Sequence, residues 1–167
     1  MKRIGLLSDT HHHLPDAVFT HFKECDEIWH AGDIGSVALA DQLEHFKPFR
    51  GVYGNIDGYE LQIRYPEYQY FSIENLNVLM IHIGGYPKRY SARAMALIRA
   101  HRPGLFISGH SHIVKVMPDP EFNLLHMNPG ACGIEGWHKV QTLIRFSIDQ
   151  GRITDLELIE LGKRGTA

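Results

Sequence analysis

Short apolar runs alternate with polar, helix-compatible segments through the first 54 residues of the chain. The apolar runs are RIGLLSD, EIWH and FRGVYG, and between them lie residues 15–24 and the stretch SVALADQLEHF, which Ser36 can cap. This alternation predicts a mainly parallel sheet with helices on its faces. Such a sheet binds its ligands in the loops that follow the carboxyl ends of its strands.

The rest of the chain is richer in strands. YQYFSIEN and NVLMIHIGG predict two strands joined by a tight turn, and SARAMALIRAHR predicts a helix capped by Ser91 and ended by Pro103. The runs LFISG, IVKVM, NLLHMN, VQTLIRFSI and ITDLELIEL predict further strands, the last two joined at DQG, and GKRGTA predicts a frayed tail. We therefore expect an α/β fold with two packed mixed sheets and helices outside, a four-layer α-β-β-α sandwich.

Composition limits the classes of partner and compartment. The 167 residues show no linker and no internal repeat, which predicts a single domain over residues 1–167. A formal net charge of -2 gives no strong nucleic-acid signal, and no apolar run approaches the roughly 20 residues of a membrane span. Cys25 and Cys132 belong to no paired motif, so we expect two reduced, partly buried thiols and a cytoplasmic location.

Five of the predicted strands end in short clusters of Gly, Asp, Asn or His. These clusters are SDTHHH, HAGDI, YGNID, MIHIGG and ISGHSH, and they hold many of the 12 histidines of the chain. Because the carboxyl ends of such strands meet at one edge of a sheet, the five clusters predict one site.

The residue types in these clusters are those of a metal centre. Asp9 and His11 stand two apart, as do His110 and His112, and on extended backbone the two side chains of each pair would point to the same side. A mononuclear site takes about four protein ligands, so a larger set predicts two ions. A carboxylate bridges two cations best, which favours Asp33 as the bridge. The seven candidate ligands are Asp9, His11, Asp33, Asn55, His82, His110 and His112.

Three of the clusters, taken alone, have a simpler explanation. Asp-x-His at a strand end is more often a loop cap, Gly-Asp is a common turn dipeptide, and Gly-Asn can form a β-turn with Asn at positive φ. The two histidines of Gly-His-Ser-His serve no packing purpose after a buried strand. Only the joint occurrence of the clusters favours the metal interpretation over the structural ones.

The set resembles the calcineurin-like metallophosphoesterases, whose pattern is D-x-H, G-D, G-N, a lone His and G-H-x-H. The resemblance covers residues 4 to about 131, and SDTHHHLPD, WHAGDI and NPGA are most similar to the small bacterial and archaeal phosphodiesterase branch. It implies that Asp9, His11 and His112 hold one ion and that Asn55, His82 and His110 hold the other, with Asp33 bridging them.

The resemblance also implies an activity, namely hydrolysis of phosphodiester bonds in a small phosphoester by attack of a hydroxide that bridges two divalent ions. Mixed nitrogen and oxygen ligands suit manganese, our first expectation, and equally iron, nickel, cobalt or zinc. The alternatives are a phosphomonoesterase, a cyclic-nucleotide phosphodiesterase, or a catalytically weak protein-interaction scaffold of the same fold. A scaffold would not need all seven candidate ligands. A homo-oligomer is possible.

The chain departs from the family pattern next to the predicted ligands. Ile56 stands where many members have a histidine that protonates the leaving group, which predicts a preference for esters with good leaving groups. His12 replaces a common glycine, and we hypothesise that it supplies part of the missing donor function; Asn55 is a candidate catalytic residue as well as a ligand. We further expect His30 to support a ligand and Asp57 to orient a metal-bound imidazole.

Overall fold

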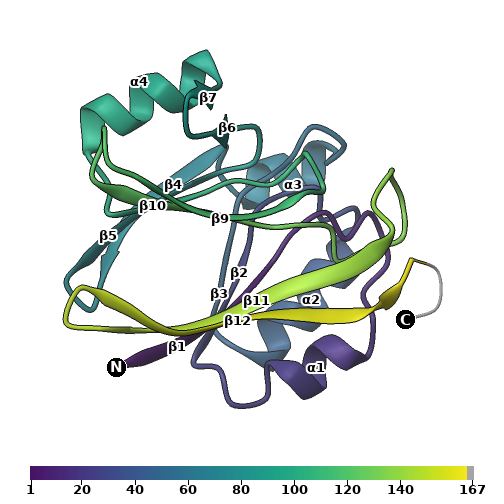
Figure 1. The fold of residues 1–167 in the computed structure, drawn as a ribbon. Helices are drawn as coiled ribbons and strands as arrows, with labels where there is room; N and C mark the ends of the chain where they lie inside the picture. The colour runs from purple at the N-terminus through teal and green to yellow at the C-terminus, as the bar shows by residue number, and fades with distance from the viewer. Residues whose placement is uncertain (165–167) are drawn as a thin grey trace.

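The computed structural model describes residues 1–164 and contains two five-stranded mixed sheets that pack face to face (Figure 1). The first sheet has the order β12-β11-β1-β2-β3, in which β1, β2 and β3 are parallel and the other two strands are antiparallel to their neighbours. Its strands are β1 (Lys2–Leu7), β2 (Glu27–His30), β3 (Phe49–Gly51), β11 (Val140–Asp149) and β12 (Arg152–Lys163).

The second sheet has the order β4-β5-β8-β10-β9, with parallel β5, β8 and β10 between antiparallel edge strands. Its strands are β4 (Tyr68–Ile73), β5 (Leu76–Ile81), β8 (Leu105–Ile107), β9 (Val114–Asp119) and β10 (Leu124–Pro129). A separate small hairpin consists of β6 (Gly85–Tyr86) and β7 (Arg89–Tyr90).

Helices cover the outer faces of the two sheets, which confirms the predicted α-β-β-α layers. The helices are α1 (Ala17–His21), α2 (Val37–Phe46), α3 (Tyr59–Arg64) and α4 (Ala92–His101). Buried residues of α1 and α2 pack on the first sheet, and those of α4 pack on the second. The two predicted caps are confirmed, because Ser36 Oγ accepts from the Leu39 amide at 3.2 Å and Ser91 Oγ from the Ala94 amide at 3.1 Å.

The core between the sheets explains why the central strands read as continuous apolar runs. Val78 and Met80 of β5 face this core, together with Trp29 and others from the first sheet, whereas Leu79 of the same strand packs under α4. A strand that is buried on both faces cannot alternate apolar with polar residues. The thiols of Cys25 and Cys132 are free, as expected, but they are fully rather than partly buried.

The structure corrects several predicted boundaries. The helix predicted over residues 15–24 covers only Ala17–His21, the third strand ends at Gly51, and α3 was not predicted. The predicted hairpin at DQG is confirmed, since Asp149 lies opposite Arg152. The frayed tail is wrong for Gly162 and Lys163, which pair with β11, while residues 165–167 lie outside the part that the structure describes.

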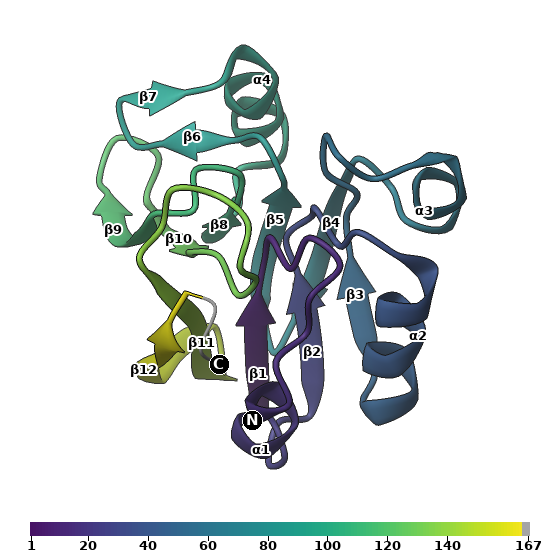
Figure 2. The ribbon, with the colours of Figure 1, turned by 90° about the vertical axis from the view of Figure 1, so that its right-hand side faces the viewer.

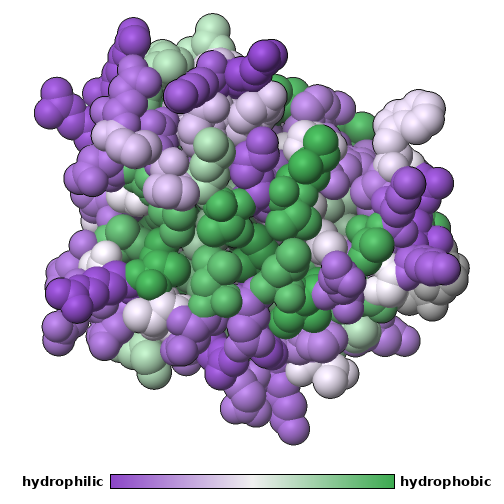
Figure 3. Space-filling model, viewed as in Figure 1, coloured by the Kyte–Doolittle hydropathy of each residue, from purple (hydrophilic) through white to green (hydrophobic). Residues whose placement is uncertain are grey.

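Apolar side chains gather on the face that carries the edge strands β9 and β12 (Figure 3). Exposed members of these strands are Val116, Met117, Leu156 and Leu158. A patch of this kind is a candidate surface for the homo-oligomer, which stays a prediction. Within residues 1–164, the longest helices have ten residues and none could cross a membrane.

Candidate metal centre

The seven predicted ligands lie in loops at the carboxyl ends of the strands, and Figure 2 shows such loops above the arrowheads of β1, β2 and β3. Asp9 and His11 follow β1, Asp33 follows β2, Asn55 follows β3, His82 follows β5, and His110 and His112 follow β8. Backbone hydrogen bonds join neighbouring loops, among them those from the Asp9 amide to Gly32 O and from the Gly109 amide to His82 O, both at 3.0 Å. The loops therefore lie side by side in the same order as the strands that precede them.

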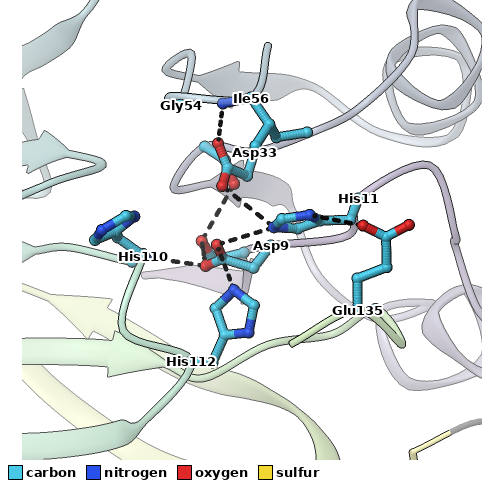
Figure 4. Close-up of polar contacts among 12 residues, drawn as sticks. Asp9, His11, Asp33, Gly54, Ile56, His110, His112 and Glu135 are labelled. Carbon is cyan, nitrogen blue, oxygen red and sulfur yellow. Dashed lines mark hydrogen bonds and ion pairs between the residues drawn. The ribbon is translucent and has the colours of Figure 1, made fainter. Parts of the chain in front are cut away.

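Three of the candidates form a first group. The ligand atoms of Asp9, His11 and His112 all lie within 4.8 Å of one another. His112 Nε2 is 3.1 Å from Asp9 Oδ1, and His11 Nε2 is 3.6 Å from the same oxygen (Figure 4). Asp9 is completely buried, so a cation here would meet a carboxylate that water does not screen.

A second group contains Asp33, His82 and His110, whose ligand atoms also lie within 4.8 Å of one another. Asn55 completes it, because its Oδ1 is 3.1 Å from His82 Nε2 and 3.0 Å from His110 Nδ1. The geometry therefore places Asn55 with the same two histidines that the resemblance implies.

Asp33 lies between the two groups. Its Oδ2 is 3.2 Å from His11 Nε2 of the first group and 3.2 Å from His82 Nε2 of the second. Its Oδ1 accepts the Ile56 amide at 3.0 Å, which fixes the orientation of the carboxylate (Figure 4). This is the position that a bridging carboxylate would occupy.

The backbone at the site is left-handed. The extended backbone that we expected for the pairs spaced by two residues is therefore wrong. Asp9 and His11 have φ of 53° and 43°, Asp33 has 57°, and His110 and His112 have 69° and 60°. These segments are not extended; each pair converges because both residues lie in the left-handed region. That region is uncommon for residues other than Gly, although Asn, Asp and His enter it more often than most, and such backbone strain is found most often at functional sites.

Lone pairs of nitrogen and oxygen atoms face one another at the centre, and they repel unless a proton or a cation lies between them. The Nδ1–H of His82 donates to Ala31 O at 2.7 Å, so the lone pair of Nε2 faces Asp33 and Asn55, both acceptors. Contacts with Asp33 and Asp9 raise the pKa of His11 to about 10. Burial disfavours charge on His82, but Asp33 and Asp9 raise its pKa nonetheless.

Divalent cations fit this donor set. Within residues 1–164, Asp9 Oδ1 and His11 Nε2 are buried without a hydrogen-bond partner. Burial alone would raise the pKa of Asp9 and Asp33, yet contacts with His11 and its neighbours hold both well below the ordinary carboxyl pKa. Both carboxyls are therefore ionised at neutral pH. The assignment of the seven residues as ligands stays a prediction.

The loop after β10 supplies two residues that the sequence analysis did not identify as part of the site. His138 Nε2–H donates to Gly133 O at 2.7 Å, so its Nδ1 can accept from His112 Nδ1–H at 3.1 Å. This bond leaves His112 Nε2 with a lone pair toward Asp9. Glu135 Oε2 lies 3.4 Å from His11 Nδ1, where it can accept the Nδ1–H and so leave His11 Nε2 facing the centre (Figure 4). Neither residue belongs to a motif, so no sequence signal could have found them.

His138→Ala is expected to weaken binding of the ion in the first group by about tenfold and to leave binding of the second ion unchanged. The reason is that His112 would no longer be held in the tautomer whose Nε2 carries the lone pair. His138→Asn should restore affinity, since the Asn Oδ1 takes the place of Nδ1. Metal titrations of His138→Ala, His138→Asn and the exposed control His45→Ala measure this. Equal weakening of both ions would contradict the role.

The remaining predictions near the site have mixed outcomes. His12 is exposed, its amide donates to Ile34 O at 3.2 Å, and within residues 1–164 no hydrogen bond reaches its imidazole; its catalytic role stays a prediction. Asp57 orients no imidazole of residues 1–164, which corrects that expectation: its carboxylate accepts the amides of Ile34, Gly35 and Gly54. His30 supports the loop backbone through a 3.1 Å bond from the Gly32 amide.

Comparison with known proteins identifies the family. Residues 1–151 match the model of the calcineurin-like phosphoesterase superfamily domain. A probable metallophosphoesterase of Methanothermobacter thermautotrophicus is 31% identical over 166 residues, covering 95% of this chain and 92% of that protein. One of Methanocaldococcus jannaschii is 31% identical over 134 residues, covering 77% and 67%. The chain therefore belongs to the calcineurin-like phosphoesterase superfamily.

Solved structures share the fold. A novel archaeal phosphodiesterase has a TM-score of 0.75 at 21% identity, covering 95% of this chain and 99% of that one. A Thermotoga maritima protein has 0.73 at 25% identity, covering 96% and 100%. Wild-type Vps29 from Entamoeba histolytica, solved with Zn²⁺, has 0.71 at 15% identity, covering 95% and 98%.

Proposed function

We propose that this phosphoesterase hydrolyses phosphodiesters with two divalent ions, held by the seven residues of the two groups. The observation that carries this proposal is Asp33 Oδ2, which lies 3.2 Å from a histidine of each group. The ions would supply Lewis acidity, lowering the pKa of water so that a hydroxide nucleophile forms at neutral pH. Manganese is the first candidate, and iron, nickel, cobalt and zinc suit the donors as well.

Two hollows beside the second group favour a diester over a monoester. The first, of about 310 Å³, is lined by Asn55, His82 and residues on the α3 side. The second, of about 230 Å³, is lined by His110 and residues of the β6–β7 hairpin, and Ile83 and Ser91 line both hollows. A phosphodiester carries two organic arms at phosphorus, one for each hollow, whereas a monoester carries one.

A panel of aryl esters tests the proposal. With added Mn²⁺ we expect bis(p-nitrophenyl) phosphate to be hydrolysed at least about tenfold faster than p-nitrophenyl phosphate, and a chelator to remove the activity. Faster turnover of the monoester would indicate a phosphomonoesterase. Absence of turnover with every one of the five metals would favour the scaffold alternative.

The hypothesis that His12 acts as a proton donor has its own test. Ile56 cannot donate a proton from its side chain, and its amide donates to Asp33 Oδ1 at 3.0 Å. We expect His12→Ala to shift a limb of the pH profile of kcat for an alkyl ester more than for an aryl ester, since a poor leaving group needs the proton. Unchanged acid and basic limbs would end the hypothesis.

Metal binding is expected to release protons. With a pKa of about 10, His11 carries a proton at pH 7, and an ion can bind its Nε2 only after that proton leaves. Affinity should therefore fall by up to about tenfold for each pH unit lost below neutrality, per proton released. Titration calorimetry in two buffers of different ionisation enthalpy measures the number of protons. A value of zero would contradict His11 as a ligand.

A further inference from the structure

We infer that the hollow beneath the β6–β7 hairpin binds a second anionic group of the substrate, a phosphate or carboxylate on one organic arm of the diester. This inference rests on the proposed function, because it concerns which diesters the same site would take. The natural substrates would then be phosphodiesters in which one arm is itself charged.

The hollow is continuous with the candidate metal centre. Its lining includes Tyr86, Arg89, His110, Lys115, His126 and Asn128, so a group bound to His110 would extend directly into it. A volume of about 230 Å³ equals roughly eight water molecules, which accommodates a phosphate and a few linking atoms. The β6–β7 hairpin lies above the ends of β8 and β10 in Figure 2.

Two cations of the hollow have no counter-ion. Within residues 1–164, neither Arg89 nor Lys115 forms an ion pair, and none of the residues that line the hollow is an Asp or Glu. Lys115 Nζ lies 3.8 Å from the centroid of the Tyr86 ring, and Tyr86 is directly opposite Arg89 in the hairpin. Side chains directly opposite in a hairpin share a face, so both cations lie beside one aromatic ring.

The hollow on the α3 side lacks this uncompensated positive charge, so the two hollows would bind different arms of the diester. Arg93 lines it, but its Nε lies 3.2 Å from Glu67 Oε1, and Glu67 lines the same hollow. Of the residues that line the two hollows, only Arg89 and Lys115 on the β6–β7 side therefore offer an anionic arm uncompensated positive charge. The structure predicts that the neutral arm enters the α3 side.

The floor of the second hollow carries no charge of its own. The Nδ1–H of the buried His126 ring donates to Phe106 O at 3.1 Å, and its Nε2 has no partner within residues 1–164. Burial lowers the pKa of His126 to about 4, so the ring is neutral at pH 7. Recognition of an anion therefore depends on Arg89 and Lys115.

A matched pair of esters tests the inference. Thymidine 5′-(p-nitrophenyl phosphate) and its 3′-phosphorylated form differ only in a second phosphate on one arm. We expect the wild type, loaded with Mn²⁺ at 0.15 M salt, to favour the 3′-phosphorylated ester by about tenfold in kcat/KM, as expected for a charge-assisted contact. Arg89→Gln combined with Lys115→Gln should abolish the preference, so that the two esters have equal kcat/KM.

The control removes the same charge elsewhere. Lys88, in the turn of the same hairpin, and Arg99 on α4 do not line the hollow, so Lys88→Gln combined with Arg99→Gln should keep the preference. Turnover without a preference, or a preference that survives in the Arg89 and Lys115 variant, would overturn the inference.

A binding measurement separates this inference from the proposed function. Calorimetry with thymidine 5′-phosphate and thymidine 3′,5′-bisphosphate gives the ratio of their Kd values without turnover. A ratio of about ten that is lost in the Arg89 and Lys115 variant supports the subsite even if neither ester is hydrolysed, which would contradict only the proposed function. Equal Kd values would overturn the subsite.

Discussion

The Asp33→Asn substitution is expected to abolish hydrolysis and to weaken the binding of both ions. Each affinity should fall by more than the roughly 10- to 100-fold that is lost when a residue hydrogen-bonded to a metal ligand is removed. The physical reason is the position of Oδ2, which lies 3.2 Å from His11 and 3.2 Å from His82. An amide oxygen carries no full charge and bridges two cations poorly. Replacing the carboxylate therefore affects both groups at once.

Metal content by elemental analysis and turnover of bis(p-nitrophenyl) phosphate measure this effect. Asp41→Asn is a suitable control, because Asp41 lies on α2 and its carboxylate pairs with Arg64 rather than with one of the seven residues. Full occupancy of both ions in Asp33→Asn would contradict a bridge. Asn55→Ala should weaken chiefly the binding of the second ion. Equal loss of both ions in this variant would show that the division into two groups is wrong.

The Gly54→Ala substitution is expected to displace the carboxylate of Asp33 and to lower both activity and stability. A Cβ at residue 54 would lie 2.0 Å from Asp33 Oδ1 and 2.3 Å from the Asp33 amide nitrogen. Neither neighbour is the end of a flexible side chain, because Asp33 is buried and its Oδ1 holds the Ile56 amide. We expect a loss of about 3 kcal/mol in the free energy of unfolding.

Gly58→Ala provides a matched control only four residues away. A Cβ at residue 58 would have no neighbour within 4 Å, so only the capping preference of α3 changes. The expected cost is at most about 1 kcal/mol, with metal content and kcat unchanged. If thermal unfolding and turnover of Gly54→Ala matched those of Gly58→Ala, the close packing of the chain against Asp33 would not matter for the site.

The sequence predicted the layers and the convergence of the ligands because both depend on strong, local signals. Apolar runs buried on both faces, such as the one with Val78, Leu79 and Met80, identify central strands, and polar residues directly after them identify the sheet edge. Family membership is shown by the comparisons. The roles of the seven residues in binding metal stay a prediction until ions are observed.

Other features had no such signal. α3 is six residues long, too short for helical periodicity to appear. The left-handed backbone at Asp9 and His11 is imposed by the surrounding loops, because intrinsic preference opposes it. Glu135 and His138 reach the site only because their loop folds back over Asp9, where the Gly133 amide donates to Asp9 O at 3.0 Å. Contacts of that kind depend on the tertiary structure.

Anomalous diffraction from crystals soaked in Mn²⁺ would locate the ions and identify the residues that hold them. We expect two peaks, with Asp33 within coordination distance of both. One should lie within coordination distance of Asp9, His11 and His112, and the other within coordination distance of Asn55, His82 and His110. A single peak, or peaks outside these loops, would contradict a dinuclear centre held by these seven residues.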